Sequence, residues 1–445
     1  MASKKPRHFS NPDFRHRSHV PLPSVEEVEK RLWELLSPSL VAPRLMERTD
    51  PKDPQRVIHM RERLLTLPVM VAIIVSLVWR RIVAVAELGR VLAQEGLLWV
   101  APLKVSEQAL AKRLDTVPAK VMGEVFEEVC ARLQAEPAGL LPGQQVWARV
   151  RSHFPVIGIV DGSTLEALRK KTQALRIVQG PALAGRIMVM VEAFSVRPLW
   201  QLYTQEATAN DKRFSAPILA AVPQGGLLIF DLGFFSFLWF DDFTKQNKFF
   251  VTRMRQKSAY RTVQLLSHGP YYRDEIIKLG QYRSNPCRHP LRMVSVLWQG
   301  VWYRYLSNVL DPQLLSARQV CELYRRRWRI EDAFLLTKRV LDLAYLWTTS
   351  ANGIELQLYA TLIFYAVLLT LCQQVAQALG QPLERISVEM VFRALYHYSR
   401  AVQRGESEEL VQFLAEHAKL LGLIKRWRKR HRERQQLEQV IWADS

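Results

Sequence analysis

Two uninterrupted apolar segments, each leading into an aspartate, most constrain how this chain can fold. Residues 154–160 are rich in Val and Ile and lead into Asp161-Gly162-Ser163, and residues 227–230 lead into Asp231-Leu232-Gly233. A short apolar run of this kind is typical of a strand buried on both faces of a sheet. Functional sites of α/β sheets lie at the carboxyl ends of such strands. We therefore expect two strands that end at carboxylates, although two unrelated loops would give the same pattern.

The segments between and around these runs predict the rest of a sheet. Further strands are expected at 186–194, 198–204 and 248–253, and a helix is expected at 216–222. The resulting order is strand, strand, strand, helix, strand, helix, strand, which suits a mixed α/β sheet.

The N-terminal part of the chain has a different character. Residues 1–24 are polar and basic with four prolines, which indicates a mobile arm, and the pattern from 25 to about 135 is helical with almost no strand signal. A short helix after Ser106, its expected N-cap, fits either the second helix of a helix-turn-helix or an ordinary packing helix. Residues 137–143 are expected to form a linker.

The C-terminal half predicts a β-rich segment followed by helices. Residues 293–298 and 301–306, separated by Gln299-Gly300, have the pattern of a β-hairpin. Ser316 then begins a helical pattern that runs to about Leu343, and an apolar helix is expected at 356–379. Residues 424–434 form a basic tail, which fits a phosphate-binding or dimer-forming segment and equally a solvated charged helix.

Charge restricts the class of partner. Lys and Arg outnumber Asp and Glu by 62 to 42 among 445 residues, which gives a net charge of +20. A folded protein with this charge favours a polyanion, and DNA, RNA and anionic membrane all qualify. Two apolar stretches, 64–79 and 356–372, are short for membrane spans, so core helices are favoured. No secretory signal is evident, and four cysteines far apart in sequence indicate reduced, intracellular thiols.

The helical pattern at 324–338 carries four functional side chains. Tyr324, Arg327, Glu331 and Lys338 stand at offsets of 0, 3, 7 and 14. At ~100° per residue of a continuous helix they fall within ~60° of one another. Such a face could hold a divalent metal ion and grip phosphates, whereas the ordinary alternative is a solvated charged stripe.

This spacing, Y-x2-R-x3-E-x6-K, resembles the signature of the insertion-sequence-4 family of DDE transposases, and all four positions match. The segments VIGIVDGST and LLIFDLGFF, the latter followed by FFVTRMR, resemble the two aspartate segments of that family. Asp231 lies 70 positions after Asp161, and Glu331 lies 100 positions after Asp231, which leaves room for the β-rich insertion of family members. The resemblance covers roughly residues 100–345.

The resemblance implies an RNase H-like core in which Asp161, Asp231 and Glu331 bind two Mg²⁺ ions, for which Mn²⁺ can substitute. Hard divalent cations take carboxylate oxygens, and a metal pair promotes in-line displacement at phosphorus. The implied reaction is cleavage at the inverted-repeat ends of a transposon and transfer of the freed 3′-hydroxyl into target DNA. The resemblance also implies that Tyr324, Arg327 and Lys338 contact DNA phosphates. It further implies that Trp298 or Trp302 stacks on an unstacked base, although either ring could simply be packed in the protein.

The fold expected from the resemblance is a multidomain α/β protein, with an all-α N-terminal domain and a helical C-terminal region flanking the core. Its partners would be double-stranded DNA and a second copy of the chain in a synaptic complex, without a membrane, in the cytoplasm at the nucleoid. The expected domains are a mobile basic arm (1–24), a helical DNA-binding domain (25–140), the first part of the core (145–255), a β-rich insertion (256–315), the catalytic-Glu helix (316–350) and a helical basic C-terminal region (351–445).

Three other functions stay open. The first is an RNase H-like DNA nuclease without strand transfer, and the second is a catalytically inactive DNA-binding regulator derived from a transposase. A peripheral membrane protein is the third, although it leaves the aspartates after the strands unexplained. The remaining acidic residues near these motifs are expected at the surface or in helix caps: Asp211, Asp241, Asp242, Glu322 and Asp332.

Overall fold

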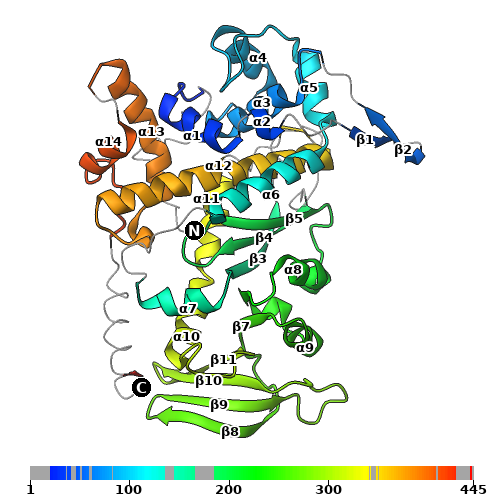
Figure 1. Ribbon diagram of the computed structural model, residues 1–445, viewed down its shortest axis with the longest axis vertical. Helices are drawn as coiled ribbons and strands as arrows, with labels where there is room; N and C mark the ends of the chain where they lie inside the picture. Colours follow the sequence, from blue (N-terminus) through cyan, green and yellow to red (C-terminus); the bar gives the residue numbers. More distant parts are fainter. Residues whose placement is uncertain are drawn as a thin grey trace, which may run out of the picture. The chain divides into compact units, whose positions relative to one another are not determined.

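The computed structural model describes residues 21–36, 38–41, 47–50, 53–59, 63–82, 84–135, 145–165, 185–339, 341, 347–348, 350–406, 409–426 and 441–442. The expected linker at 137–143, most of the N-terminal arm and most of the basic tail lie outside these residues. Figure 1 draws the helices and strands of the chain, which forms two compact units. The first comprises residues 1–129, 341–364 and 395–408, and the second comprises residues 130–340, 365–394 and 409–445.

The first unit is mainly helical but is not all-α. A two-stranded antiparallel sheet, β1 (Glu47–Asp50) with β2 (Asp53–His59), interrupts the helices. The sequence gives little sign of it, because apolar residues are rare between 47 and 59. The helices are α1 (Glu26–Leu36), α2 (Pro38–Val41), α3 (Leu67–Trp79), α4 (Val85–Gln94), α5 (Glu107–Thr116) and the first part of α6 (Ala119–Ala135).

Two local features of this unit bear on the helix-turn-helix considered for the helix after Ser106. Ser106 caps α5 as expected, since its hydroxyl accepts a hydrogen bond of 3.3 Å from the backbone N–H of Ala109. Residues 95–106 connect α4 to α5. This connection is longer than the three- to four-residue turn of a helix-turn-helix, so α4 and α5 do not form one.

The second unit is built on a nine-stranded sheet with the order β5-β4-β3-β6-β7-β11-β10-β9-β8. β3, β4 and β5 pair antiparallel, whereas β6 is parallel to β3 and β7 is parallel to β6. The expected mixed sheet is therefore confirmed. The bounds of these five strands are β3 (Ile157–Leu165), β4 (Gly185–Glu192), β5 (Pro198–Thr204), β6 (Leu227–Ile229) and β7 (Phe249–Arg253).

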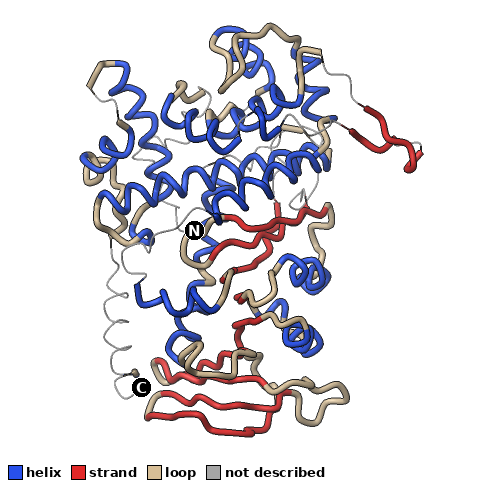
Figure 2. Tube along the Cα trace, viewed as in Figure 1, coloured by secondary structure: helices blue, strands red, loops and turns tan. Residues whose placement is uncertain are grey.

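The β-rich segment continues this sheet. β11 pairs antiparallel with β7 through Tyr305, Leu306 and Ser307, and β10, β9 and β8 then extend the sheet in that order (red in Figure 2). The expected hairpin at 293–306 is confirmed, and its turn residues Gln299 and Gly300 have φ of 49° and 77°. Two positive φ values are typical of a type I′ turn. The strands are β8 (Tyr260–Gly269), β9 (Tyr272–Leu279), β10 (Leu291–Trp298) and β11 (Val301–Ser307).

An aromatic cluster packs α8 (Ser215–Ala221) and α9 (Phe237–Lys245) against the sheet. The ring of Phe230 is fully buried and lies 4.6 Å from Trp239 and 5.6 Å from Phe250, centroid to centroid. Aromatic pairs at this separation add to the stabilisation from burial alone. Since Phe230 directly precedes Asp231, this packing holds the backbone from which the Asp231 side chain projects.

The long helix expected after Ser316 is two helices, α10 (Ala317–Arg326) and α11 (Arg329–Arg339). Ser316 begins α10 with a full capping box, as its position suggests. The break arises because backbone N–H groups 327, 328, 330 and 331 bond to the carbonyls three residues earlier, not four. Such 3₁₀-type bonding tightens the turn, so the four motif residues do not share one continuous helix face.

The remaining helices include one very apolar element, α12 (Ala351–Ala378). It is long and apolar enough to cross a membrane, but 83% of its most apolar window is buried inside the protein, as in an ordinary core helix. The expected apolar helix at 356–379 is thereby confirmed. The other helices are α7 (Ala148–His153), α13 (Val388–Gln403) and α14 (Leu410–Glu416), with short 3₁₀ turns at Gln145–Trp147, Asp211–Phe214, Leu232–Phe234 and Leu383–Arg385.

Candidate active site

The two aspartates occupy equivalent positions on neighbouring parallel strands. Ile159 of β3 pairs in register with Ile229 of β6, and each aspartate stands two residues further along its chain. One expectation was wrong: β3 does not end at Asp161 but continues to Leu165, because antiparallel β4 keeps pairing with it, Asp161 opposite Val189. β6 does end before Asp231. Both carboxylates therefore project at the edge where β6 has stopped.

One guanidinium joins the three expected catalytic carboxylates. Arg327 donates from Nη1 to Oδ2 of Asp161 at 3.0 Å. Its Nε lies 4.0 Å from Oδ1 of Asp231, and its Nη2 lies 3.8 Å from Oε1 of Glu331. The hydroxyl of Tyr324 donates to the same Oδ1 of Asp231 at 3.1 Å. The structure thus brings together residues from β3, the turn after β6 and the α10–α11 segment.

Lys338, the last motif residue, contacts the strand that carries Asp161. Its Nζ donates to the hydroxyl of Ser163 and to the backbone carbonyl of Thr164, the latter at 2.7 Å. These bonds tie α11 to the part of β3 that extends beyond Asp161. The four motif residues therefore lie at the same end of β3 and β6 despite the break in the helix. Tyr324 and Arg327 reach the two aspartates, and Lys338 of α11 reaches β3.

Burial governs the electrostatics of this edge. Desolvation raises the pKa of Asp161 to about 6, against the lowering effects of the Gly162 backbone N–H and of Arg327, while Asp231 adds to the increase. Desolvation and the neighbouring Asp231 also raise the pKa of the Tyr324 hydroxyl, which stays protonated and can donate. Asp231 and Glu331 are more open, with side chains 43% and 50% exposed.

A second ion pair beside the site was missed by the sequence reasoning. Arg186 of β4 pairs with Asp211, which was expected in an ordinary polar loop. A Cβ built on Gly162 would lie 3.0 Å from Nη2 of Arg186, so the guanidinium covers the backbone next to Asp161. A Cβ on Gly233 would lie 2.7 Å from Oδ2 of Asp211. The available signal was the pair Gly162 and Gly233, which stand one and two positions after the aspartates, since a glycine permits such close approach.

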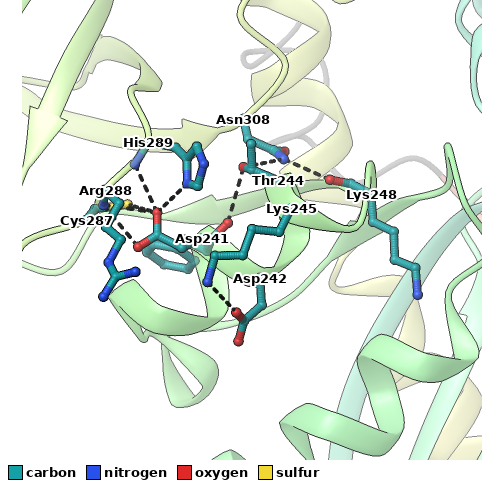
Figure 3. A network of polar contacts seen from close by, with 10 residues as sticks. Asp241, Asp242, Thr244, Lys245, Lys248, Cys287, Arg288, His289 and Asn308 are labelled. Carbon is teal, nitrogen blue, oxygen red and sulfur yellow. Dashed lines mark hydrogen bonds and ion pairs between the residues drawn. The ribbon is translucent and has the colours of Figure 1, made fainter.

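The expectation for Asp241 was also wrong. Its carboxylate is 1% exposed and accepts hydrogen bonds from the backbone N–H groups of Arg288 and His289 at 3.0 Å (Figure 3). Nδ1 of His289 lies 2.8 Å away, and the thiol of Cys287 lies 3.3 Å away. Burial alone would raise the pKa of Asp241, but these donors outweigh it and lower the pKa. Asp241 therefore fastens residues 287–289 to α9.

The other acidic residues fit the surface positions expected of them. Asp242 pairs with Lys245 at 3.3 Å, and Glu322 pairs with Arg318 at 2.8 Å, all partly exposed. Asp332 is exposed on α11.

An aromatic cavity of about 420 Å³ lies on the insertion strands beside α10. Five rings contribute to its wall: Trp298, Tyr303, Tyr305, Trp328 and Trp442. Trp328 also stacks on the motif, with the guanidinium carbon of Arg327 lying 4.5 Å from its ring centroid. Trp302 does not line the cavity and is 43% exposed. The structure therefore separates the two tryptophans that the sequence treated alike.

The carboxylates have the oxygen donors that a hard divalent cation requires. Among the described residues, however, no group of three or more His, Cys, Asp or Glu side chains is arranged closely enough to hold a metal ion. The guanidinium of Arg327 lies among the three carboxylates instead. The carboxylate oxygens are of the chemical type that Mg²⁺ prefers. In this structure, however, the three carboxylates are arranged around the guanidinium of Arg327.

Residues 152–367 match the family described as the transposase DDE domain. This part of the chain is therefore similar to the transposase DDE domain. The matched range includes the complete nine-stranded sheet, the three carboxylates and all four motif residues. The similarity to this family thus covers both the sheet and the site.

Similarity to curated proteins agrees with this assignment. A Sinorhizobium fredii protein that bears the name transposase is 25% identical over 285 residues, which is 57% of this chain and 78% of the relative. A Geobacillus stearothermophilus protein, named as the transposase of an insertion sequence element, is 27% identical over 167 residues. That match covers 36% of this chain and 43% of the relative.

A solved structure of the piggyBac transposase, in a synaptic complex with hairpin DNA, is similar over 93% of this chain and 86% of its own. The identity is 10% and the TM-score 0.35, so this likeness carries no argument about the chain.

Proposed function

We propose that this protein is the transposase of an insertion sequence, which cuts DNA at inverted-repeat ends and joins the freed 3′-hydroxyl to target DNA. The observation that carries this proposal is the contact of one guanidinium with Asp161, Asp231 and Glu331 inside a transposase DDE domain. Three carboxylates from separate parts of the sequence meet at one sheet edge. Such an arrangement is expected of a metal-dependent phosphodiester site.

We assign the core to the RNase H-like class. The strand order β5-β4-β3-β6-β7, with an antiparallel meander followed by two parallel strands, supports this assignment. We assign the family to insertion-sequence-4, on the match to Y-x2-R-x3-E-x6-K. The convergence of Tyr324, Arg327, Glu331 and Lys338 on one edge supports that assignment.

In this proposal Asp161, Asp231 and Glu331 hold two Mg²⁺ ions, or Mn²⁺ in their place. When bound, the metal pair activates the attacking oxygen and stabilises the leaving one. Arg327 provides a planar fork suited to bidentate phosphate contact, and Lys338 provides a point charge. Tyr324, whose hydroxyl stays protonated, adds a third donor to phosphate. Together these residues would orient a DNA strand across the edge between β3 and β6.

For the unstacked base next to the cut, we propose Trp298 and not Trp302. Trp298 lines the aromatic cavity, whereas Trp302 lies outside it. Stacking on aromatic rings stabilises an extruded base by ~1–3 kcal/mol. The cavity wall also includes Arg325, a cation that suits the neighbouring phosphate.

The remaining expectations stay part of the proposal. Double-stranded DNA is the partner favoured by the net charge of +20 and by the transposase domain. The N-terminal helices would bind the transposon end, a homodimer would assemble on paired ends, and the protein would act at the nucleoid in the cytoplasm. We propose that residues 25–140 form the DNA-binding domain, that 145–255 and 316–350 form the core, and that 256–315 form the insertion. The arm (1–24) and the basic C-terminal region (351–445) complete this division.

The test is DNA cleavage and strand transfer with Mg²⁺ on duplexes carrying the inverted repeats that flank the gene. Asp161→Asn, Asp231→Asn and Glu331→Gln should each abolish both steps and preserve DNA binding. Asp332→Asn is the matched control, because it removes the same charge from the next residue of α11 and should retain activity. Cleavage without joining would identify a nuclease, and binding without cleavage would identify a regulator. Activity in all three variants would refute the triad.

A further inference from the structure

Arg327 is more deeply buried than all three of the carboxylates it contacts. Its side chain is 6% exposed, compared with 43% for Asp231 and 50% for Glu331. A buried guanidinium needs compensating negative charge, and the three carboxylates supply it. Arg327 therefore stabilises a cluster that would otherwise repel itself.

A divalent cation would need the oxygens that Arg327 now contacts. Oδ2 of Asp161 accepts directly from Nη1 at 3.0 Å, and the other two carboxylates lie within 4.0 Å of the same guanidinium. A hydrogen bond to the guanidinium and a coordination bond to a metal draw on the same lone pairs. Arg327 and the metal ions are thus competitors for Asp161, Asp231 and Glu331.

Arg327 also retains an unused donor. Its Nε is buried and has no hydrogen-bond acceptor within the described part of the chain. A phosphate accepts from two guanidinium nitrogens at once, so it could satisfy this donor better than the present partners do. The backbone at 327–328 lies between α10 and α11, where 3₁₀-type bonds replace the regular ladder. Such a break is a common site of hinge motion.

We propose that Arg327 couples DNA binding to metal loading. Without DNA, its guanidinium holds the three carboxylates together and opposes the entry of divalent cations. A DNA phosphate draws the guanidinium away, and the freed oxygens then take up metal. This inference rests on the proposed function and adds to it an order of assembly, in which the substrate enables its own cofactor to bind.

Thermodynamic linkage makes the coupling measurable without catalysis. If DNA raises the affinity for metal by some factor, metal must raise the affinity for DNA by the same factor. Replacing Arg327 by Gln removes the competing charge and the phosphate contact together. Arg327→Gln should therefore bind metal tightly without DNA and should gain little affinity when DNA is added.

The experiment measures Mn²⁺ binding to the full chain by the decrease of the free-ion paramagnetic resonance signal, with and without a short duplex of arbitrary sequence. In the absence of DNA we expect Arg327→Gln to bind Mn²⁺ about tenfold more tightly than the parent, the effect of one lost charge-assisted interaction. The duplex should tighten Mn²⁺ binding in the parent and leave the variant nearly unchanged. Arg318→Gln removes an equal charge from an exposed site on α10 and should behave as the parent.

The outcomes separate this inference from the proposed function. Equal or weaker Mn²⁺ binding by Arg327→Gln, or an equal gain from DNA in parent and variant, would overturn the coupling. The double variant Asp161→Asn with Arg327→Gln tests the site itself. If it binds Mn²⁺ as tightly as Arg327→Gln, the carboxylates are not the metal site and the proposed function fails instead.

Should Arg327→Gln fail to fold, Arg327→Lys keeps the charge but cannot reach three carboxylates at once. It should show an intermediate Mn²⁺ affinity and a reduced response to DNA. A parent-like affinity with a parent-like response would overturn the coupling.

Discussion

Nη1 of Arg327 donates a hydrogen bond of 3.0 Å to Oδ2 of Asp161, although 166 positions separate the two residues. The same guanidinium reaches Asp231 and Glu331, so a single side chain defines the centre of the candidate active site. Because the bond joins β3 to the break between α10 and α11, it also links the position of the motif helix to the sheet.

The raised pKa of Asp161 predicts a pH-dependent cost to stability. The folded pKa of about 6 exceeds the ordinary value of 3.8, so the folded chain binds more protons between these pH values than the unfolded chain. The contribution of Asp161 to the free energy of unfolding is therefore fully present below about pH 4, and it is lost as pH rises through about 6. Relative to Asp161→Asn, the parent should lose about 2–3 kcal/mol of unfolding free energy between about pH 4 and pH 7. Urea unfolding across this range measures the difference, and a constant difference would contradict the expectation.

Asp241→Asn should destabilise the second unit by about 2–4 kcal/mol. The amide cannot accept the bonds from Arg288, His289 and Cys287 with both of its polar atoms, and it places a buried N–H₂ group against donors. Chemical denaturation measures the change. Asp242→Asn is the control, since its carboxylate is 45% exposed and pairs with the equally open Lys245, and it should change stability by less than about 0.5 kcal/mol. Similar effects of the two substitutions would contradict the anchoring role of Asp241.

Gly162→Ala adds a single methyl group but should still reduce DNA cleavage. The new Cβ would lie 2.7 Å from Sδ of Met188 and 3.0 Å from Nη2 of Arg186, so both side chains must shift beside Asp161. We expect a loss of about 1–3 kcal/mol in stability and a decrease in cleavage. Gly89→Ala in α4, where only Leu110 Cδ1 lies near, at 3.8 Å, should be neutral or stabilising by up to about 1 kcal/mol. Parent-like cleavage in Gly162→Ala would show that the close approach of Arg186 is unimportant.

Trp298→Ala and Trp302→Ala should differ in their effect on an unstacked base. With 2-aminopurine placed next to the cleavage position, the parent should change its fluorescence on binding, and Trp298→Ala should weaken that response. The lost stacking corresponds to ~1–3 kcal/mol, or about five- to 150-fold in the population of the extruded base. Trp302→Ala should retain the parental response, because its ring lies outside the cavity. The opposite ranking would assign the stacking role to Trp302.

The sequence by itself determined the features that depend on neighbouring residues. The strand at 198–204, the turn at Gln299-Gly300 and the caps at Ser106 and Ser316 all appear where they were expected. Each follows from local periodicity, from backbone preference or from a side chain that bonds to its own helix. The aspartates were found in the same way, because a buried strand next to a carboxylate is a local pattern.

Only the tertiary structure decided how these parts meet. The continuation of β3 past Asp161 depends on its pairing with β4, and the break after Arg326 accompanies contacts of Arg327 with Asp161 of β3 and with Asp231 in the turn after β6. The burial of Asp241 likewise depends on residues 287–289, which are remote in sequence. Local preference cannot specify such features, because the free energy that decides them comes from partners brought together only when the sheet is complete.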